Sequence, residues 1–146
     1  MHILVINGPN LNLLGTRQVE IYGNKTYQDL ENILKEEALN LDISIEIHQT
    51  NFEGIIIDLL HYAKHKNFDG ILLNAAAYTH YSYAIYDAIL AIHLPVVEVH
   101  LTDLASRKEA FRRTSVIEDA CIKTFSGKGF DSYIEALNYL SKEVSK

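Results

Sequence analysis

Gly70-Ile71-Leu72-Leu73-Asn74 is the stretch that decides the fold class of this chain. Its apolar residues follow one another without a polar interruption, which is typical of a strand buried on both faces in a parallel sheet. The run ends at the Asn74 amide, and small and polar residues follow as far as His80. The stretch therefore predicts a central strand that delivers polar groups at its carboxyl end.

Four further apolar runs, at residues 3–6, 43–47, 96–99 and 121–125, share this pattern. Longer segments separate them, and their apolar residues recur every three or four positions, as expected for amphipathic helices. These segments lie near residues 27–41, 56–63, 84–92 and 134–144; Thr26 is placed to cap the first, and a short extra helix is expected within 104–114. The alternation predicts an α/β fold, an open five-stranded parallel sheet with helices on both faces.

Length and composition limit the possible functions. The 146 residues fit one domain, 1–146. Nineteen acidic and thirteen basic side chains give a net charge of −6, so nucleic acid is not expected as a partner. No apolar run approaches the roughly 20 residues of a membrane span. Cys121 is the only cysteine and no secretory signal is recognisable, so we expect a cytoplasmic protein.

Residues 7–23 form an unusually long connection between the first strand and the first helix. Such connections normally take about two to six residues in α/β units. The segment contains Leu, Ile and Tyr residues that would pack onto something, which favours an ordered binding loop. We expect residues 15–25 to act as a lid.

Ligands of open parallel sheets bind beyond the carboxyl ends of the strands. The first strand runs into Asn10, the third into Asn74 and His80, and the fourth into Glu98 and His100. Amides, imidazoles and a carboxylate at one edge suit a polar ligand and proton transfer. Neither a GxGxxG nor a GxxxxGK[ST] motif occurs, so no nucleotide cofactor is indicated. The two histidines lack a third ligand at metal-binding spacing, so no metal site is indicated.

The motifs at these strand ends resemble those of the type II 3-dehydroquinase family, and the likeness covers essentially the whole chain. The matching segments are Asn7-Gly8-Pro9-Asn10-Leu11-Asn12-Leu13-Leu14-Gly15, Arg17 with Glu20-Ile21-Tyr22-Gly23, Asn51-Phe52-Glu53-Gly54, Asn74 with Ala77-Tyr78-Thr79-His80, and Val97-Glu98-Val99-His100-Leu101. The resemblance implies a flavodoxin-like sheet and a dodecamer built from trimers. It also implies dehydration of 3-dehydroquinate to 3-dehydroshikimate, the third step of the shikimate pathway, without a cofactor.

The resemblance also assigns catalytic roles. Dehydration beside a ketone needs a base, an enolate stabiliser and a proton donor. Tyr22 is the implied base. A free phenol has a pKa of about 10, so a cation is needed to favour the phenolate, and Arg17 in the same loop is the implied cation. His100 is the implied acid, Glu98 orients it, and Asn10 stabilises the enolate through water.

The implied substrate-binding residues are Asn74, His80, Leu101, Thr102 and Arg112, with Asp87 reaching a neighbouring subunit's site. Taken singly, residues of this kind also fit structural roles, such as a packed loop aromatic for Tyr22 or a solvent-facing helix position for Asp87. Their combination favours catalysis.

The chain departs from the family pattern at several positions. Asp103 stands where an Asn is usual, and the segment before Phe111 is one residue longer, so either Arg107 or Lys108 takes the place of an upstream Arg. Tyr81, Tyr83 and Tyr86 are further departures.

Other small domains of this fold bind phosphorylated ligands or receive a phosphoryl group. A phospho-receiver needs an aspartate where Asn74 stands, and a sugar-phosphate lyase needs a phosphate nest that this sequence lacks. A scaffold that only binds a hydroxy acid would have little reason to keep Arg17, Tyr22 and His100 together.

Overall fold

The computed structural model describes residues 1–146 and contains one five-stranded sheet. The strands are β1 (His2–Asn7), β2 (Ser44–Gln49), β3 (Gly70–Asn74), β4 (Val96–Val99) and β5 (Lys123–Phe125), in the order β2-β1-β3-β4-β5. All neighbouring strands are parallel, as predicted. β5 begins at Lys123 rather than at residue 121, because a 3₁₀ turn at Glu118–Ala120 closes onto Cys121 first.

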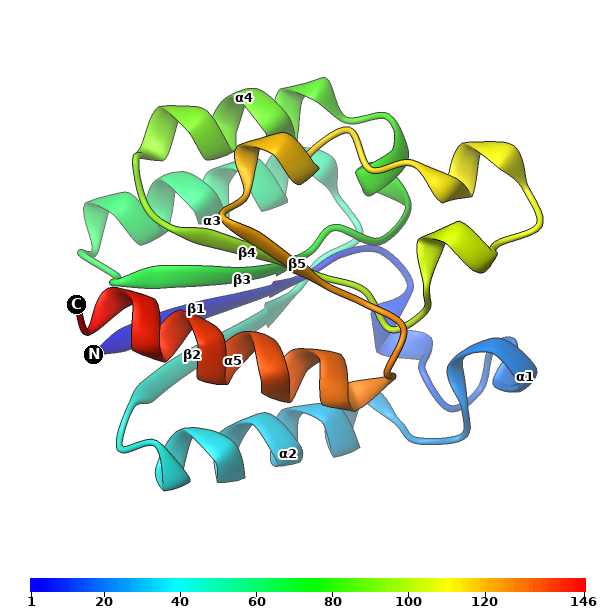
Figure 1. Cartoon of the computed structure of the whole chain (residues 1–146), viewed down its shortest axis with the longest axis horizontal. Coiled ribbons are helices and arrows are strands. Elements are labelled where there is room, and N and C mark those ends of the chain that lie inside the picture. The colour runs from blue at the N-terminus through cyan, green and yellow to red at the C-terminus, as the bar shows by residue number, and fades with distance from the viewer.

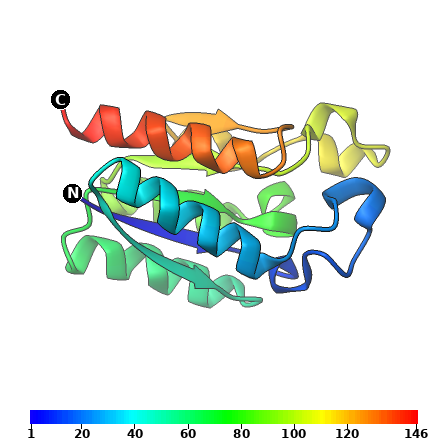
Figure 2. The same ribbon diagram turned by 90° about the horizontal axis from the view of Figure 1, so that it is seen from below.

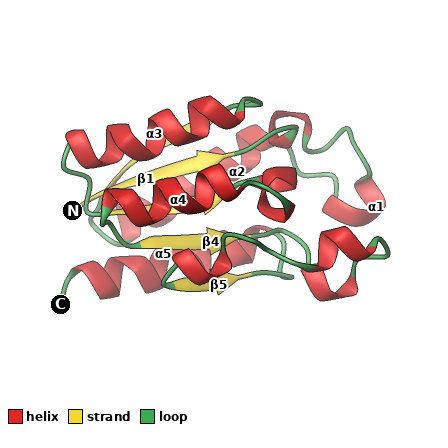
Figure 3. Ribbon diagram, turned by 90° about the horizontal axis from the view of Figure 1, so that it is seen from above, coloured by secondary structure: helices red, strands yellow, loops and turns green.

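Helices cover both faces of the sheet, which confirms the predicted α/β architecture (Figure 1). α2 (Tyr27–Asn40) and α5 (Phe130–Val144) lie side by side on one face, as Figure 2 shows from below. α3 (Glu53–His65) and α4 (Tyr83–Ile92) cover the other face (Figure 3). No helix is both long and apolar enough to cross a bilayer.

Strand residues alternate between two apolar cores. Ile3 and Val5 of β1 face the core beneath α2 and α5, whereas Leu4 and Ile6 face the core beneath α3 and α4. All four are fully buried. This explains why the strand sequences read as unbroken apolar runs: a sheet covered on both faces has no solvent-facing side.

The predicted N-cap of α2 is confirmed as a capping box. The Thr26 hydroxyl accepts a hydrogen bond from the backbone N–H of Asp29 (3.1 Å), and the Asp29 carboxylate accepts one from the backbone N–H of Thr26 (2.8 Å). Two otherwise unpaired N–H groups of the first turn are thereby satisfied. The helix start fixes where the long loop before it ends.

The segment 104–114 contains short helical structure, as expected, but no α-helix. The segment instead forms two 3₁₀ turns, Leu104–Ser106 and Ala110–Arg113. The Arg113 side chain donates from Nε to the carbonyl of Arg107 and from Nη2 to that of Lys108, each at 2.7 Å. Those carbonyls would accept backbone bonds in a continuous α-helix. The side chain thus takes the place of helical hydrogen bonds.

All strands point toward the same edge of the sheet, and the segments that project beyond it are α1 (Val19–Tyr22) and the two 3₁₀ turns (Figures 1 and 3). At this edge Gly8 passes close to the end of β3. A Cβ atom at Gly8 would lie 2.6 Å from the Ala75 carbonyl oxygen, so only glycine fits there without a shift of backbone.

Candidate active site

A pocket of about 130 Å³ opens at the carboxyl edge of the sheet, between the long loop after β1 and the 3₁₀ turns after β4. Most of the site residues expected from the sequence line it: Asn10, Arg17, Tyr22, Asn74, His80, His100, Leu101, Thr102 and Arg112. Glu98 lies behind His100 and is fully buried. Asp87 is solvent-exposed on α4 and does not line this pocket.

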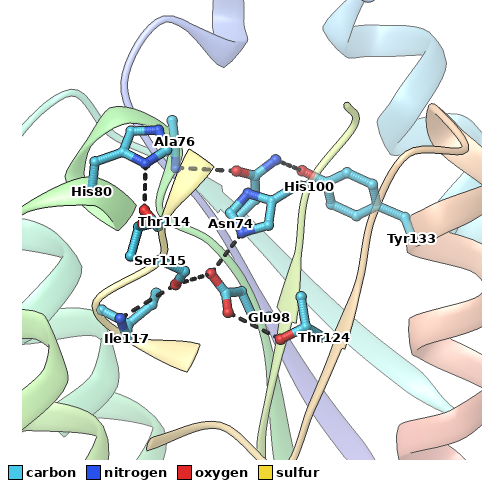
Figure 4. Close-up of polar contacts among 10 residues, drawn as sticks. All are labelled: Asn74, Ala76, His80, Glu98, His100, Thr114, Ser115, Ile117, Thr124 and Tyr133. Atoms are coloured by element: carbon cyan, nitrogen blue, oxygen red, sulfur yellow. Dashed lines mark hydrogen bonds and ion pairs between the residues drawn. The ribbon is translucent and has the colours of Figure 1, made fainter. Parts of the chain in front are cut away.

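His100 is held from behind by Glu98. The ring Nε2 lies 2.6 Å from Oε1 of the Glu98 carboxylate, and His100 is only 5% exposed (Figure 4). Burial by itself would raise the pKa of Glu98, but hydrogen bonds from His100, Ser115 and Thr124 outweigh it and lower that pKa. A charged carboxylate can only accept, so Nε2 carries a proton and Nδ1 is the ring nitrogen left for a ligand.

Tyr22 stands between two arginines. Arg107 Nη1 donates to the phenol oxygen at 3.1 Å, and the Arg17 guanidinium carbon lies 4.8 Å from the centre of the phenol ring. The sequence assigned the cation beside the phenol to Arg17; the structure adds Arg107 and gives it the direct hydrogen bond. Two guanidinium groups therefore face the phenol, Arg107 at its oxygen and Arg17 at its ring.

Of the two residues left open, Arg107 and Lys108, the structure brings Arg107 to the pocket. Arg107 lines the pocket and also lies 3.4 Å from the Thr102 hydroxyl, whereas Lys108 does not line the pocket. Arg113 holds the backbone carbonyls of both residues. The turn is held by these two bonds, and the Arg107 side chain reaches Tyr22.

Asn74 belongs to a buried polar chain. Its Nδ2 donates to the Tyr133 hydroxyl (2.8 Å), which donates to Oδ1 of Asn7 (2.7 Å), the residue opposite Asn74 on β1. Oδ1 of Asn74 accepts from the backbone N–H of Ala76 at 3.1 Å (Figure 4). Tyr133 is fully buried, and this burial raises its pKa, so it stays a neutral donor. The amide plane of Asn74 is thus fixed before any ligand binds.

His80 has a defined tautomer. Its Nδ1 lies 2.8 Å from the Thr114 carbonyl, which can only accept, so Nδ1 carries a proton (Figure 4). Desolvation by burial lowers the pKa of His80; the hydrogen bond to Thr114 opposes that shift, and electrostatic interactions with His100, Arg112 and Arg107 add to it. In the neutral ring Nε2 is an acceptor, which suits a hydroxyl group of a ligand.

Arg112 and Asn10 complete the pocket wall. The Nε–H of Arg112 is buried without a hydrogen-bond partner, although Oε1 of Glu109 lies 3.5 Å away. Asn10 adopts the left-handed conformation (φ 66°), and its backbone N–H donates to Oδ1 of Asn51 at 3.0 Å. This bond holds the turn after β1 and leaves the Asn10 side chain at the pocket.

Some important residues carried no recognisable signal in the sequence. Tyr133 lies inside a helix, and its hydroxyl is brought to the strand ends only by packing. Ser115 and Thr124, which bond Glu98, come from a loop and from the neighbouring strand. Asp103 caps a 3₁₀ turn by accepting from the Ala105 N–H and does not line the pocket.

No group of three or more His, Cys, Asp or Glu side chains in this chain is arranged so that it could hold a metal ion.

Comparison with known proteins gives a consistent result. The family model "Dehydroquinase class II" matches residues 1–141. A 3-dehydroquinate dehydratase of Caldicellulosiruptor saccharolyticus is 51% identical over 142 residues, 97% of each chain, and one of Clostridium acetobutylicum is 49% identical over the full length of both. The crystal structure of type II dehydroquinase from Butyrivibrio crossotus superposes with a TM-score of 0.94 at 46% identity, covering 96% of this chain and 97% of that one. The expected flavodoxin-like sheet is thereby confirmed.

Proposed function

Because this chain belongs to the class II dehydroquinase family, we infer that it dehydrates 3-dehydroquinate to 3-dehydroshikimate in the shikimate pathway. The observation that carries this inference within the molecule is the position of Tyr22 and His100. Both line one small pocket, the first hydrogen-bonded by a guanidinium and the second by a buried carboxylate.

We propose the following chemistry for the pocket. The Tyr22 phenolate, favoured by Arg107 and Arg17, removes the proton beside the ketone and an enolate forms. Asn10 stabilises the enolate through a bridging water. His100 then delivers a proton from Nδ1 to the departing hydroxyl, while Glu98 holds Nε2 and stabilises the ring's positive charge. Proton removal and proton delivery thus come from different walls of the pocket.

The remaining pocket residues are proposed to bind the substrate. The Arg112 guanidinium suits the carboxylate because it offers several donors in a fixed fork. Asn74 has one Nδ2 hydrogen left after its bond to Tyr133, and neutral His80 offers an acceptor to a hydroxyl. Leu101 and Thr102 supply backbone and side-chain contacts at the end of β4.

Replacement of Tyr22 by Phe tests the base. We expect Tyr22→Phe to lower kcat by at least about 100-fold, the usual contribution of a positioned acid or base. The measurement is the ultraviolet absorbance of the conjugated enone formed from 3-dehydroquinate. Tyr139→Phe, which removes a hydroxyl on α5 where the ring packs against Phe125, is the matched control and should keep full activity. Full turnover by Tyr22→Phe would reject the base, and no turnover by the wild type would reject the reaction.

Replacement of Arg107 tests the hydrogen bond to the phenol. Arg107→Gln should lower kcat near neutral pH on the order of 10- to 100-fold, because one preorganised charged donor is lost. Residual activity should climb as pH rises, since the phenolate then forms without the cation. Arg17→Gln should act in the same direction. Lys108→Gln is the control and should leave the pH profile of kcat unchanged. Profiles of Arg107→Gln and wild type that run parallel at every pH would contradict this account.

We propose that residues 15–25 form a lid over bound substrate. Gly15 and Gly23 have positive φ angles of 87° and 80°, and between them only Arg17 and Tyr22 are partly buried. Both line the pocket, and Tyr22 ties the loop to the rest of the protein through its hydrogen bond from Arg107. Substrate contacts would add to these two and exclude water from the reaction.

Limited trypsin digestion tests lid closure. Tyr22→Phe protein, which is expected to consume substrate at least about 100-fold more slowly than the wild type, should be cleaved after Arg17 more slowly when 3-dehydroquinate is added. Cleavage after the exposed Lys128, which does not line the pocket, should keep its rate. Equal rates after Arg17 with and without substrate would argue against closure.

A dodecamer built from trimers in the cytoplasm is proposed with this function. The position of Asp87, exposed on α4 and away from its own chain's pocket, supports a role at a neighbouring subunit's site. Light scattering should give a mass twelve times that of the 16.6 kDa chain. A monomeric mass with full activity would reject both the assembly and this role of Asp87.

A further inference from the structure

The Glu98 carboxylate receives two hydrogen bonds that the proposed chemistry does not use. Ser115 Oγ lies 2.6 Å from Oε1, and Thr124 Oγ1 lies 3.1 Å from Oε2 (Figure 4). With His100 Nε2, three donors from three segments converge on a side chain that is fully buried. Thr124 is the residue directly opposite Glu98 in the β4–β5 pairing, so the sheet register sets its position.

The direction of both bonds follows from the chemistry of the groups. A carboxylate has no hydrogen to give, so each hydroxyl donates. Ser115 Oγ also accepts the backbone N–H of Ile117 at 3.3 Å, which leaves its own hydrogen for Glu98. Without these donors Glu98 would remain buried with acceptor sites unfilled, which is costly for a charged group.

We propose that Ser115 and Thr124 are positioning residues for the acid of this reaction: they keep Glu98 ionised and fix its plane so that His100 is held as proton donor. The proposal rests on the dehydratase function inferred above. Neither hydroxyl lines the catalytic pocket, so both act only through Glu98. They line instead a second cavity of about 270 Å³, together with Arg113, Glu118 and Ser126.

The second cavity makes the choice of variant important. A smaller side chain at Ser115 or Thr124 would open space through which water from that cavity can reach Glu98 and replace the lost donor. Valine at position 124 keeps the shape of threonine and fills the space without donating. Thr124→Val therefore removes the hydrogen bond alone, and Thr124→Ser restores the hydroxyl.

Other ionisable groups near Glu98 and His100 could also affect how kcat depends on pH. On the catalytic side these are His80, Arg107, Arg112 and Tyr22, all of which the variant leaves in place. Cys121 lies on the Glu98 side; burial raises the pKa of its thiol and the Glu98 charge adds to this, so it stays neutral. Glu118 and Arg113 lie across the second cavity. The ionised Glu98 thus depends on the two hydroxyls and on His100.

The test compares kcat against pH for Thr124→Val, Ser115→Ala and wild type. Thr124→Val should lower kcat by roughly tenfold, the scale of one lost hydrogen bond to a charged group, with KM nearly unchanged because Glu98 does not touch substrate. Loss of the Thr124 hydrogen bond raises the pKa of Glu98, so the carboxylate is neutralised more readily as pH falls. The acidic limb of the kcat profile should therefore move to higher pH, and the difference from wild type should grow as pH falls. Ser115→Ala should show the same effect or a smaller one.

Two controls separate positioning from simple support of the fold. Thr124→Ser should recover the wild-type profile, and Ser126→Ala, which lines the same cavity without bonding Glu98, should match wild type throughout. A wild-type profile for Thr124→Val, or an equal loss for Ser126→Ala, would overturn the proposal. So would a uniform drop in kcat at every pH that Thr124→Ser fails to restore.

A second readout does not depend on activity. The His100 Nε2 proton that bonds Glu98 should give a downfield proton resonance in the wild type, and this resonance should shift upfield or exchange faster in Thr124→Val. An unchanged resonance would overturn the proposal. Absence of turnover by the wild type would instead reject the dehydratase function, and the resonance would still test whether the hydroxyls hold the pair.

Discussion

The hydrogen bond from Arg107 to the Tyr22 phenol is the interaction on which the site depends, because it joins segments 85 residues apart across the mouth of the pocket. One segment is the long loop after β1, and the other is the clamped turn after β4. The sheet register places both at the same edge, and His100 at the end of β4 completes the group. Without this bond the loop would cover the pocket but would not fix the phenol opposite the imidazole.

Charge is distributed unevenly in a way that suits an anionic substrate. The chain as a whole carries a net charge of −6, yet Arg17, Arg107 and Arg112 all line one small pocket. Cations gathered in a cleft raise the local concentration of anions and stabilise developing negative charge. The acidic side chain nearest the reaction, Glu98, is kept behind His100 and surrounded by donors, so its charge acts on the imidazole rather than on the substrate.

The sequence predicted the sheet and most of the pocket for clear physical reasons. Unbroken apolar runs require burial on both faces, parallel strands end together, and so Asn74 and His100 had to meet at one edge. The turn after β4 was less predictable, because the carbonyls of Arg107 and Lys108 are bound by the Arg113 side chain, a contact with no periodic pattern. For the same reason, the sequence assigned the cation beside Tyr22 to Arg17 alone and could not choose between Arg107 and Lys108. In the sequence Thr124 is indistinguishable from any other strand residue. Its hydrogen bond to Glu98 follows from its position opposite Glu98 in the β4–β5 pairing.

The central claim is that a phenol held by guanidinium and an imidazole held by carboxylate act on the same small molecule. The most direct measurement is a crystal structure of the protein with a cyclic hydroxycarboxylate analogue of 3-dehydroquinate bound. The account predicts Tyr22 Oη and His100 Nδ1 on different sides of the ligand ring, each at roughly 3 Å from it, with Arg107 still bonded to Tyr22. A ligand seated beyond the reach of either side chain, with the loop closed, would contradict it.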